Sequence, residues 1–253
     1  MLRLAPDLLA GLADLVLPAA CAGCGAERVP LRYGTCAGCV AGLEALTPYP
    51  TVPASPPPGM PPCTAVGPYA GPLRSVLLAY KERGRHRLAR PLGALLAGAV
   101  ADAAIRAGGG PRVPLILVPV PSTARAVRDR HGDHMARLTA HTVRRLRSAG
   151  WQARAVQPLH VLPRPDSATL DPAARAEVAG RTLRIRSSGI RVLQRTVSRR
   201  SILVVVDDIV TTGATMAAVA GRLREANVQV TGTAVLAATR LRKASATGLT
   251  GLP

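Results

Sequence analysis

The 253-residue sequence contains no phenylalanine, one tryptophan and four tyrosines. Hydrophobic residues still make up 48% of the chain, so we expect an aliphatic interior built from alanine, valine and leucine. Few aromatic rings also disfavour sequence-tolerant binding of single-stranded nucleic acid, which uses such rings as stacking platforms. The length suits one large α/β domain with a small appendage.

Acidic residues are scarce: 14 Asp and Glu stand against 33 Lys and Arg, which gives a net charge of +19. Lysine is scarcer still, since Lys81 and Lys243 are the only ones beside the arginines. Two interpretations stay open. The positive charge indicates a polyanionic partner, such as nucleic acid or a phosphorylated metabolite. Alternatively, the abundance of arginine beside Ala, Gly and Pro reflects a GC-rich genome.

Long apolar runs are missing as well: none approaches the ~20 residues of a membrane-spanning helix, so we expect no membrane span. The N-terminal stretch MLRLAPDLLAGLADLVLPAAC is loosely similar to an export signal, but a proline and two aspartates interrupt it. Its apolar residues recur at helical spacing, at Leu8, Leu9, Leu12, Leu15 and Val16. We therefore predict a short amphipathic helix on the body of a cytoplasmic protein.

Only five cysteines are present, and four of them form two C-x-x-C pairs: Cys21, Cys24, Cys36 and Cys39. Glycines inside these pairs let each turn fold back so that backbone amides point at sulfur. Four thiolates suit a tetrahedral zinc ion with no open coordination position, which predicts a structural Zn²⁺ site. Two disulfides in a secreted protein are the alternative, but nothing else argues for an oxidising compartment. Cys63 is expected to be a free thiol.

Prolines divide the chain. Eight of them lie between residues 47 and 63, a density that excludes a helix or a central strand. We predict an extended linker over residues 46–65. It separates residues 1–45, with the amphipathic helix and the four-cysteine zinc module, from a larger domain over residues 66–240. Residues 241–253 are predicted to be a disordered tail.

Strand and helix patterns alternate in the larger domain. Apolar runs predict buried strands at residues 113–121, 151–157, 201–208 and 228–239. Apolar spacing predicts helices at residues 72–80, 88–107, 133–149 and 214–226, the last with Met216, Val219, Ala220 and Leu223 inward. Strands separated by helices indicate an α/β fold with an open, mainly parallel sheet and flanking helices.

Two of the few acidic residues, Asp207 and Asp208, are neighbours at the end of a predicted strand, and TTGAT follows them. Ligands bind beyond the carboxyl ends of strands in such sheets. Free amides at the start of the next helix attract anions, and Thr211, Thr212 and Thr215 add hydroxyls. Carboxylates accept hydrogen bonds from hydroxyl groups, so the pattern indicates a ribose 5-phosphate. Helix capping by the aspartates is the alternative.

The string ILVVVDDIVTTGAT closely resembles the phosphoribosyl pyrophosphate (PRPP) motif of type I phosphoribosyltransferases. The resemblance implies that Asp207 and Asp208 bind the ribose hydroxyls. It implies that the 5′-phosphate lies on the loop formed by Thr211, Thr212, Gly213, Ala214 and Thr215. It also implies Mg²⁺ bound together with the pyrophosphate.

Four features occur in the order found in the ComF/GntX-like proteins: the double C-x-x-C, residues 69–97, residues 118–132 and the PRPP motif. This resemblance covers roughly residues 8–240. It implies a type I phosphoribosyltransferase-like fold with a zinc ribbon, and phosphoribosyl transfer to an unidentified nitrogen acceptor. The alternative function is a non-catalytic or sensor protein of DNA uptake, contacting nucleic acid or a protein of the competence machinery. Either is compatible with a homo-oligomer.

Basic residues are expected to stabilise the departing pyrophosphate. Lys81 and Arg130 are predicted to be catalytic together with the two aspartates, and further candidates are Arg83, Arg85, Arg125 and Arg128. For both basic stretches, residues 81–85 and 125–130, a solvated basic surface is the alternative interpretation.

The chain departs from the family pattern at three places. Residues 130–134 read RHGDH where members often carry Arg-Gly-Phe-Asn-Gln, residues 166–167 read DS in place of a Gln, and residues 175–178 read RAEV in place of Arg-x-x-Asn. His131 and His134 are thereby candidates for an acid or base. The departures lie in segments that the resemblance places at the pyrophosphate and the second substrate, whereas the PRPP motif itself is intact.

Overall fold

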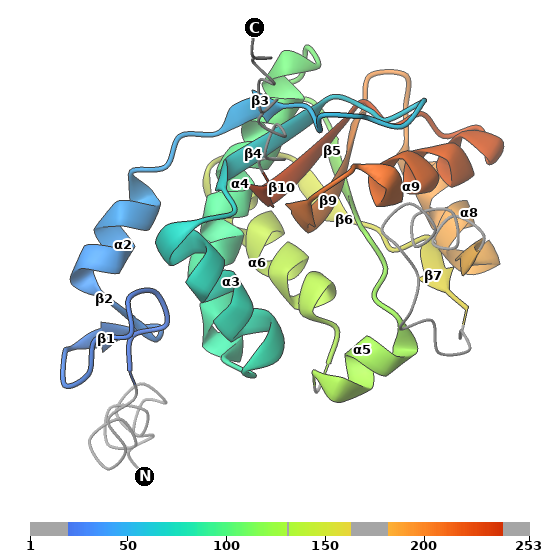
Figure 1. The fold of residues 1–253 in the computed structure, drawn as a ribbon. Coiled ribbons are helices and arrows are strands. Elements are labelled where there is room, and N and C mark those ends of the chain that lie inside the picture. Colours follow the sequence, from blue (N-terminus) through green and yellow to red (C-terminus); the bar gives the residue numbers. More distant parts are fainter. Residues whose placement is uncertain (1–19, 131, 163–181, 240–253) are drawn as a thin grey trace, which may run out of the picture.

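The computed structural model describes residues 20–130, 132–162 and 182–239. A six-stranded sheet in the order β3-β4-β10-β9-β5-β6 forms the centre (Figure 1). Five strands run parallel, and the edge strand β3 (Tyr49–Thr51) is antiparallel. The parallel strands are β4 (Cys63–Pro68), β5 (Leu115–Pro119), β6 (Ala153–Ala155), β9 (Ile202–Val210) and β10 (Gly232–Ala238). The predicted α/β class with a mainly parallel sheet is confirmed.

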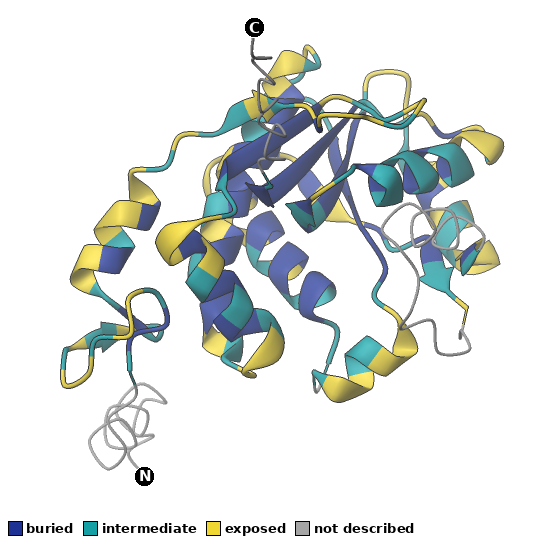
Figure 2. Cartoon of the chain, viewed as in Figure 1, coloured by how far each residue is buried: buried dark blue, intermediate teal, exposed yellow. Residues whose placement is uncertain are grey.

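Helices cover both faces of this sheet. One face packs against α3 (Gly71–Glu82), α4 (Ala89–Arg106) and α6 (His134–Ser148), and the other against α8 (Ser187–Thr196) and α9 (Ala214–Glu225). The side chains of β9 alternate accordingly: Val204 and Val206 join the first core cluster, and Leu203 and Val205 join the second. Figure 2 shows the buried strands between helices whose outer sides are exposed.

The predicted helices and strands of the larger domain are confirmed to within a few residues, because each carries a strong apolar pattern. Met216, Val219, Ala220 and Leu223 are the buried residues of α9, as predicted. Strand β4, helix α8 and several shorter elements were not predicted. The shorter ones are α5 (Ala124–Asp129), the 3-10 turn η1 (His86–Leu88) and the antiparallel pair β7 (Leu159–Val161) and β8 (Leu183–Ile185).

By length and composition alone, the helical stretch His86–Arg106 is apolar enough to cross a membrane, with a mean hydropathy of 1.5 over an 18-residue window. Within the protein, 56% of that window is buried, and α4 packs against α6, β10 and β4. The stretch therefore serves as a core helix of the α/β domain. The expectation that no membrane span is present stays a prediction.

The four-cysteine segment folds into β1 (Leu31–Arg32), β2 (Thr35–Cys36) and α2 (Ala37–Glu44), beside α3 (Figure 1). Arg85 donates a hydrogen bond of 2.6 Å to the carbonyl oxygen of Ala20. The guanidinium of Arg90 lies 4.9 Å from the ring centre of Tyr33. The segment thus contacts both the turn that follows α3 and the first turn of α4. The predicted N-terminal helix and C-terminal tail fall outside the described residues.

The proline-rich segment contributes more than a connection. Within residues 46–65, β3 pairs with β4 at the edge of the sheet, where Pro50 is tolerated because an edge strand has unpaired amides. Further along, Met60 packs against the cluster that contains Val210 and Met216. The proposed boundaries near residues 45 and 65 stay a prediction.

Candidate functional site

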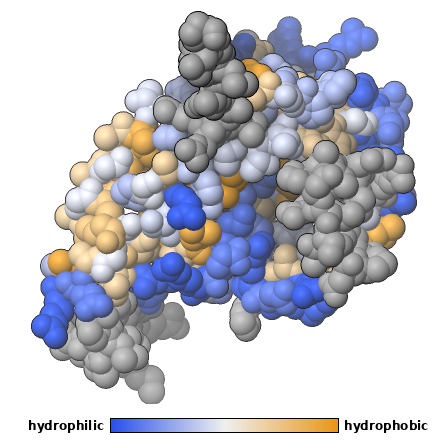
Figure 3. Space-filling view, in the orientation of Figure 1, coloured by the Kyte–Doolittle hydropathy of each residue, from blue (hydrophilic) through white to orange (hydrophobic). Residues whose placement is uncertain are grey.

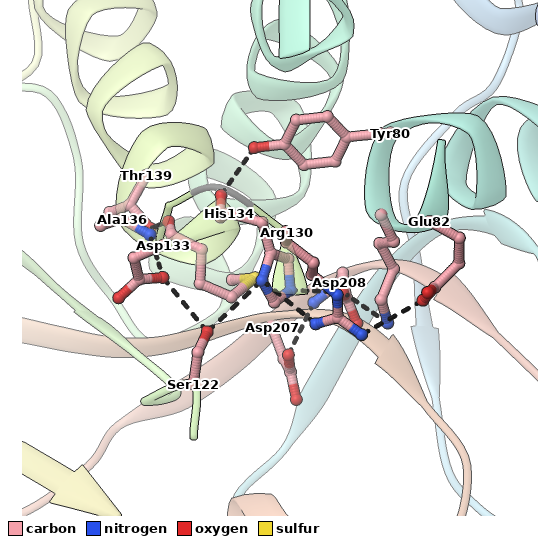
Figure 4. A network of polar contacts seen from close by, with 12 residues as sticks. Tyr80, Glu82, Ser122, Arg130, Asp133, His134, Ala136, Thr139, Asp207 and Asp208 are labelled. Carbon is pink, nitrogen blue, oxygen red and sulfur yellow. Dashed lines mark hydrogen bonds and ion pairs between the residues drawn. The ribbon is translucent and has the colours of Figure 1, made fainter. Parts of the chain in front are cut away.

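The two adjacent aspartates lie inside β9, because the strand continues to Val210. Neighbouring side chains of a strand point to opposite faces. Asp208 faces α3 and α6, whereas Asp207 points away from that cluster (Figure 4). The expectation that both carboxylates stand together at the strand end therefore needs correction, since the strand extends two residues further than its apolar run suggested.

Asp208 is buried and engaged by two donors, with 5% of its surface exposed. Its Oδ2 atom lies 2.8 Å from Nζ of Lys81 and 3.1 Å from Nε2 of His134. Burial alone raises the pKa of Asp208, but the His134 hydrogen bond and the Lys81 charge outweigh it and lower this pKa to about 2. Asp208 is therefore a carboxylate at neutral pH.

Asp207 has the opposite electrostatic environment. Its Oδ1 atom accepts a hydrogen bond of 2.9 Å from the backbone amide of Asp208. Burial and the negative charge of Asp208 together raise the pKa of Asp207 to about 8. The negative charge of the pair therefore resides first on Asp208, and its presence opposes ionisation of Asp207.

A polar network extends from Asp208 through His134 (Figure 4). Nδ1 of His134 lies 3.4 Å from both Ser122 Oγ and Arg130 Nη1. Ser122 donates to Asp133, which also accepts a hydrogen bond of 3.2 Å from Gln157. The network thus joins β9 to the start of α6 and to the segment that follows β5.

A pocket of about 510 Å³ opens beside this network, where α3 and α5 end. Its lining is rich in charge: Lys81, Glu82, Arg83, Gly84, Thr123, Arg125, Ala126, Asp129 and Arg130. The space-filling view shows a hydrophilic surface over these helix ends (Figure 3). Lys81 connects the pocket to Asp208, and Arg130 pairs with Glu82 at 3.1 Å. We refer to this cavity as the cationic pocket.

The structure separates the predicted basic residues into two groups. Lys81, Arg83, Arg125 and Arg130 line the cationic pocket together. Arg85 instead points to the four-cysteine segment, where it binds the carbonyl oxygen of Ala20. Arg128 is not part of the lining. Basic residues that are neighbours in sequence therefore do not all face the same pocket.

Thr211, Thr212 and Gly213 form a loop, here called the threonine-glycine loop, that joins β9 to the N-terminus of α9. Gly213 is the residue before α9 and has φ 79°, a left-handed conformation that favours glycine. A side chain at Gly213 would overlap the sulfur of Met60. The amide of Ala214 lies 3.4 Å from Oγ1 of Thr212. The loop therefore places helix N-terminal amides at the carboxyl end of β9, as an anion site requires.

The four cysteines of the N-terminal segment converge. All four Sγ atoms, those of Cys21, Cys24, Cys36 and Cys39, lie within 4.8 Å of one another. Cys24 and Cys36 are separated by 3.7 Å, and a tetrahedral ion with Zn–S bonds of ~2.3 Å holds its sulfurs about 3.8 Å apart. Among the described residues, no other group of three or more His, Cys, Asp or Glu could hold a metal ion.

Local geometry explains the C-A-G-C sequence. The sulfur of Cys21 accepts hydrogen bonds from the amides of Gly23 (3.4 Å) and Cys36 (3.2 Å), as the glycine pattern predicted. A Cβ atom at Gly23 would lie 2.6 Å from the sulfur of Cys39. Glycine is therefore required here by the packing of the sulfurs.

Sequence reasoning missed much of the network. His134 was a candidate acid or base, but its contact with Asp208 was not foreseen, and Ser122, Glu82 and Gln157 were not considered. One signal in the sequence could have located His134. Asp133 caps α6 by accepting a hydrogen bond from the amide of Ala136, and His134 is then the first, buried residue of the helix. His131 and the departures at residues 166–167 and 175–178 fall outside the described residues.

Comparison with known proteins agrees with this geometry. Residues 173–247 match the family described as phosphoribosyl transferase domain, a stretch that includes β9, the threonine-glycine loop and α9. No curated protein matches the chain. The C-terminal region of the chain therefore has the sequence of a phosphoribosyltransferase domain, and a four-cysteine cluster lies near the N-terminus.

Proposed function

We propose that the protein binds PRPP with Mg²⁺ in the cytoplasm and transfers its phosphoribosyl group to a nitrogen acceptor, as a member of the ComF/GntX-like proteins. The observation that supports this most is the environment of Asp208. Its carboxylate pairs with Lys81, which also lines the cationic pocket, and the strand that carries it leads through residues 211–213 to the N-terminus of α9. In the proposal, a ribose bound at Asp208 directs one phosphate to the pocket and the other to the helix N-terminus.

Each part of PRPP has a matching part of the site in this proposal. Asp208 and Asp207 accept the ribose hydroxyls, and because Asp207 points to the other face of β9, this role requires its side chain to rotate on binding. The 5′-phosphate rests on the loop of residues 211–215 at the start of α9. The pyrophosphate occupies the cationic pocket, where Arg83, Arg125 and Arg130 join Lys81. Arginine suits this task because its planar fork can hold two phosphate oxygens.

The chain's own residues supply most of the proposed chemistry. The bond from C1 of the ribose to the pyrophosphate oxygen breaks, and the acceptor nitrogen forms the new bond at C1. Lys81 and Arg130 stabilise the negative charge that develops on the departing pyrophosphate. The carboxylate of Asp208 faces the oxocarbenium-like ribose and stabilises its positive charge. Mg²⁺, when bound, neutralises pyrophosphate charge, and the oxygen atoms of the aspartate pair and of PRPP are ligands that it prefers.

We further propose that the four cysteines bind a structural Zn²⁺ ion. The converging sulfurs and the amides directed at Cys21 support this assignment. Metal analysis of the purified, reduced protein should find a single zinc ion per chain, and a Cys24→Ser/Cys36→Ser variant should lose it. Zinc-free wild-type protein would contradict the assignment.

Calorimetry tests the main proposal directly. PRPP and Mg²⁺ are titrated into the wild type, into an Asp207→Asn/Asp208→Asn variant and into an Asp102→Asn control, whose carboxylate pairs with Arg106 on α4. We expect micromolar binding to the wild type and the control, and none to the double variant. Failure of the wild type to bind at millimolar PRPP would rule out the proposed function. Binding would justify a screen of nitrogen acceptors by pyrophosphate release.

One observation favours the second candidate function, a DNA-uptake protein that contacts nucleic acid. A surface pocket of about 490 Å³ between α4 and α6 is lined by Arg90, Ala94, His141, Arg144, Arg145 and Ser148, without a carboxylate. Such a surface fits the alternative of a DNA-uptake protein that contacts nucleic acid. Counterion release predicts that binding there weakens steeply with salt. An Arg144→Ala/Arg145→Ala variant would then lose DNA binding while it still binds PRPP.

A further inference from the structure

His134 is a buried polar side chain of the site, with 7% of its surface exposed, close to the 5% of its partner Asp208. It is the first residue of α6, directly after the capping Asp133. Both ring nitrogens have partners: Nε2 contacts Asp208, and Nδ1 lies near Ser122 and Arg130. A buried histidine with partners on both nitrogens has a fixed ring orientation.

The partners also determine how the ring is protonated. The carboxylate of Asp208 only accepts hydrogen bonds, so Nε2 of His134 must carry the hydrogen between them. The guanidinium of Arg130 only donates, so Nδ1 acts as the acceptor toward it. His134 therefore directs a hydrogen-bond donor at Asp208 from a position fixed at both ends.

This donor acts on one oxygen of Asp208. Lys81 and His134 both contact Oδ2, from α3 and α6 respectively. Among the described residues, no partner contacts Oδ1 of Asp208. Two donors on one oxygen fix the carboxylate plane and leave the second oxygen with its acceptor capacity.

We infer that His134 is a positioning residue for ribose recognition: it holds Oδ2 of Asp208 so that Oδ1 accepts a specific hydroxyl of the pentose phosphate. The inference rests on the proposed function, and it names what selects the ligand. A sugar that lacks this hydroxyl leaves Oδ1 buried without a donor, which costs binding affinity. His134 thereby contributes to preference for ribose over deoxyribose phosphates, although it does not touch the sugar.

The surroundings allow this role to be separated from folding. Tyr80 donates a hydrogen bond of 2.6 Å to the backbone carbonyl of His134, not to its ring. Asp133 caps the helix through the amide of Ala136. Both interactions survive substitution of the His134 side chain, so α6 should keep its place in the variants.

The test uses His134→Leu, which removes the donor, and His134→Gln, whose amide nitrogen reaches about as far as Nε2. Thr139→Val is the matched control, because it removes a buried polar group from the same helix. Affinities for ribose 5-phosphate and for its 2-deoxy and 3-deoxy analogues are measured by calorimetry, with a melting curve for each variant. Comparison across the three ligands identifies the hydroxyl that Oδ1 accepts.

We expect His134→Leu to weaken ribose 5-phosphate binding roughly 10-fold, the effect of losing one charge-assisted hydrogen bond. Binding of one deoxy analogue should change little, so the preference for ribose falls by a similar factor. His134→Gln should restore most of the preference, and Thr139→Val should keep it.

Three outcomes would overturn the inference, and they are distinguishable. If the wild type binds no pentose phosphate, PRPP with Mg²⁺ included, the proposed function fails and the inference fails with it. If the wild type prefers ribose and His134→Leu prefers it equally, the proposed function stands and the role of His134 is refuted. If His134→Leu loses affinity for all three ligands alike, His134 acts only on the general structure of the site.

Discussion

The two faces of β9 place the same type of side chain in opposite electrostatic environments. On the face toward α3 and α6, Asp208 receives Lys81 and His134, which lower its pKa to about 2. On the other face, burial and the charge of its neighbour raise the pKa of Asp207 to about 8. Adjacent residues with the same side chain thus differ because distant helices deliver donors to one face alone.

The largest effect on stability is expected when the cation that pairs with Asp208 is removed. Lys81→Met leaves a buried carboxylate with His134 as its remaining partner, which should lower the free energy of unfolding by about 3 kcal/mol at neutral pH. Urea denaturation measures the change. Arg106→Met is the control, since it breaks the exposed pair with Asp102 and should cost less than about 1 kcal/mol. Equal effects in both variants would mean that burial of Asp208 carries no energetic weight.

Substitution of the other aspartate should have the opposite sign. The raised pKa of Asp207 means that its folded form binds a proton more tightly than the unfolded form, so stability is lost as pH rises from about 4 through about 8. Asp207→Asn removes this loss and should raise the Tm at pH 8 by roughly 4 °C, with almost no change at pH 4. Thermal melts from pH 4 to pH 9 follow the difference.

Asp129→Asn serves as the reference for those melts, because it makes the same substitution at a side chain that is 65% exposed and should change stability little. Destabilisation by Asp207→Asn at pH 8 would show that Asp207 is ionised and favourably paired. The two faces would then be electrostatically alike.

The smallest expected effect concerns the loop that follows β9. Gly213→Ala places a side chain at a left-handed position and against the sulfur of Met60, which should cost about 1–2 kcal/mol of stability. Met60→Ala in the same chain should relieve the overlap but not the backbone strain. Chemical denaturation of the single and double variants separates the two contributions. A double variant as stable as the wild type would show that strain at Gly213 is negligible.

Much of this architecture could be predicted from local patterns. The runs VPLILVPVP and SILVVVDD are apolar because their strands are buried on both sides, and they appear as β5 and β9. The two C-x-x-C pairs are close in sequence, so their convergence could be predicted as well. The pair β7 and β8 could not, because its short strands depend on contacts between distant parts of the chain.

The polar network lay beyond sequence reasoning for the same reason. Lys81, His134 and Asp208 come from three elements far apart in the chain, and no spacing rule connects them. The opposite orientation of the aspartates could have been predicted by strand alternation, had the strand been extended to Val210. Predicting where a carboxylate lies proved easier than predicting which groups it meets.

The order of strands has a consequence for biosynthesis. β10 lies between β4 and β9 at the middle of the sheet, and Thr233 bonds to Pro62, 171 residues away in sequence. A nascent chain on the ribosome therefore holds β4 and β9 apart until residues 232–238 have been translated. The sheet closes only then, and the apolar strands made earlier must be shielded from aggregation during the interval. Chains that pause or terminate before residue 232 should consequently depend on chaperones to keep their apolar strands from aggregating.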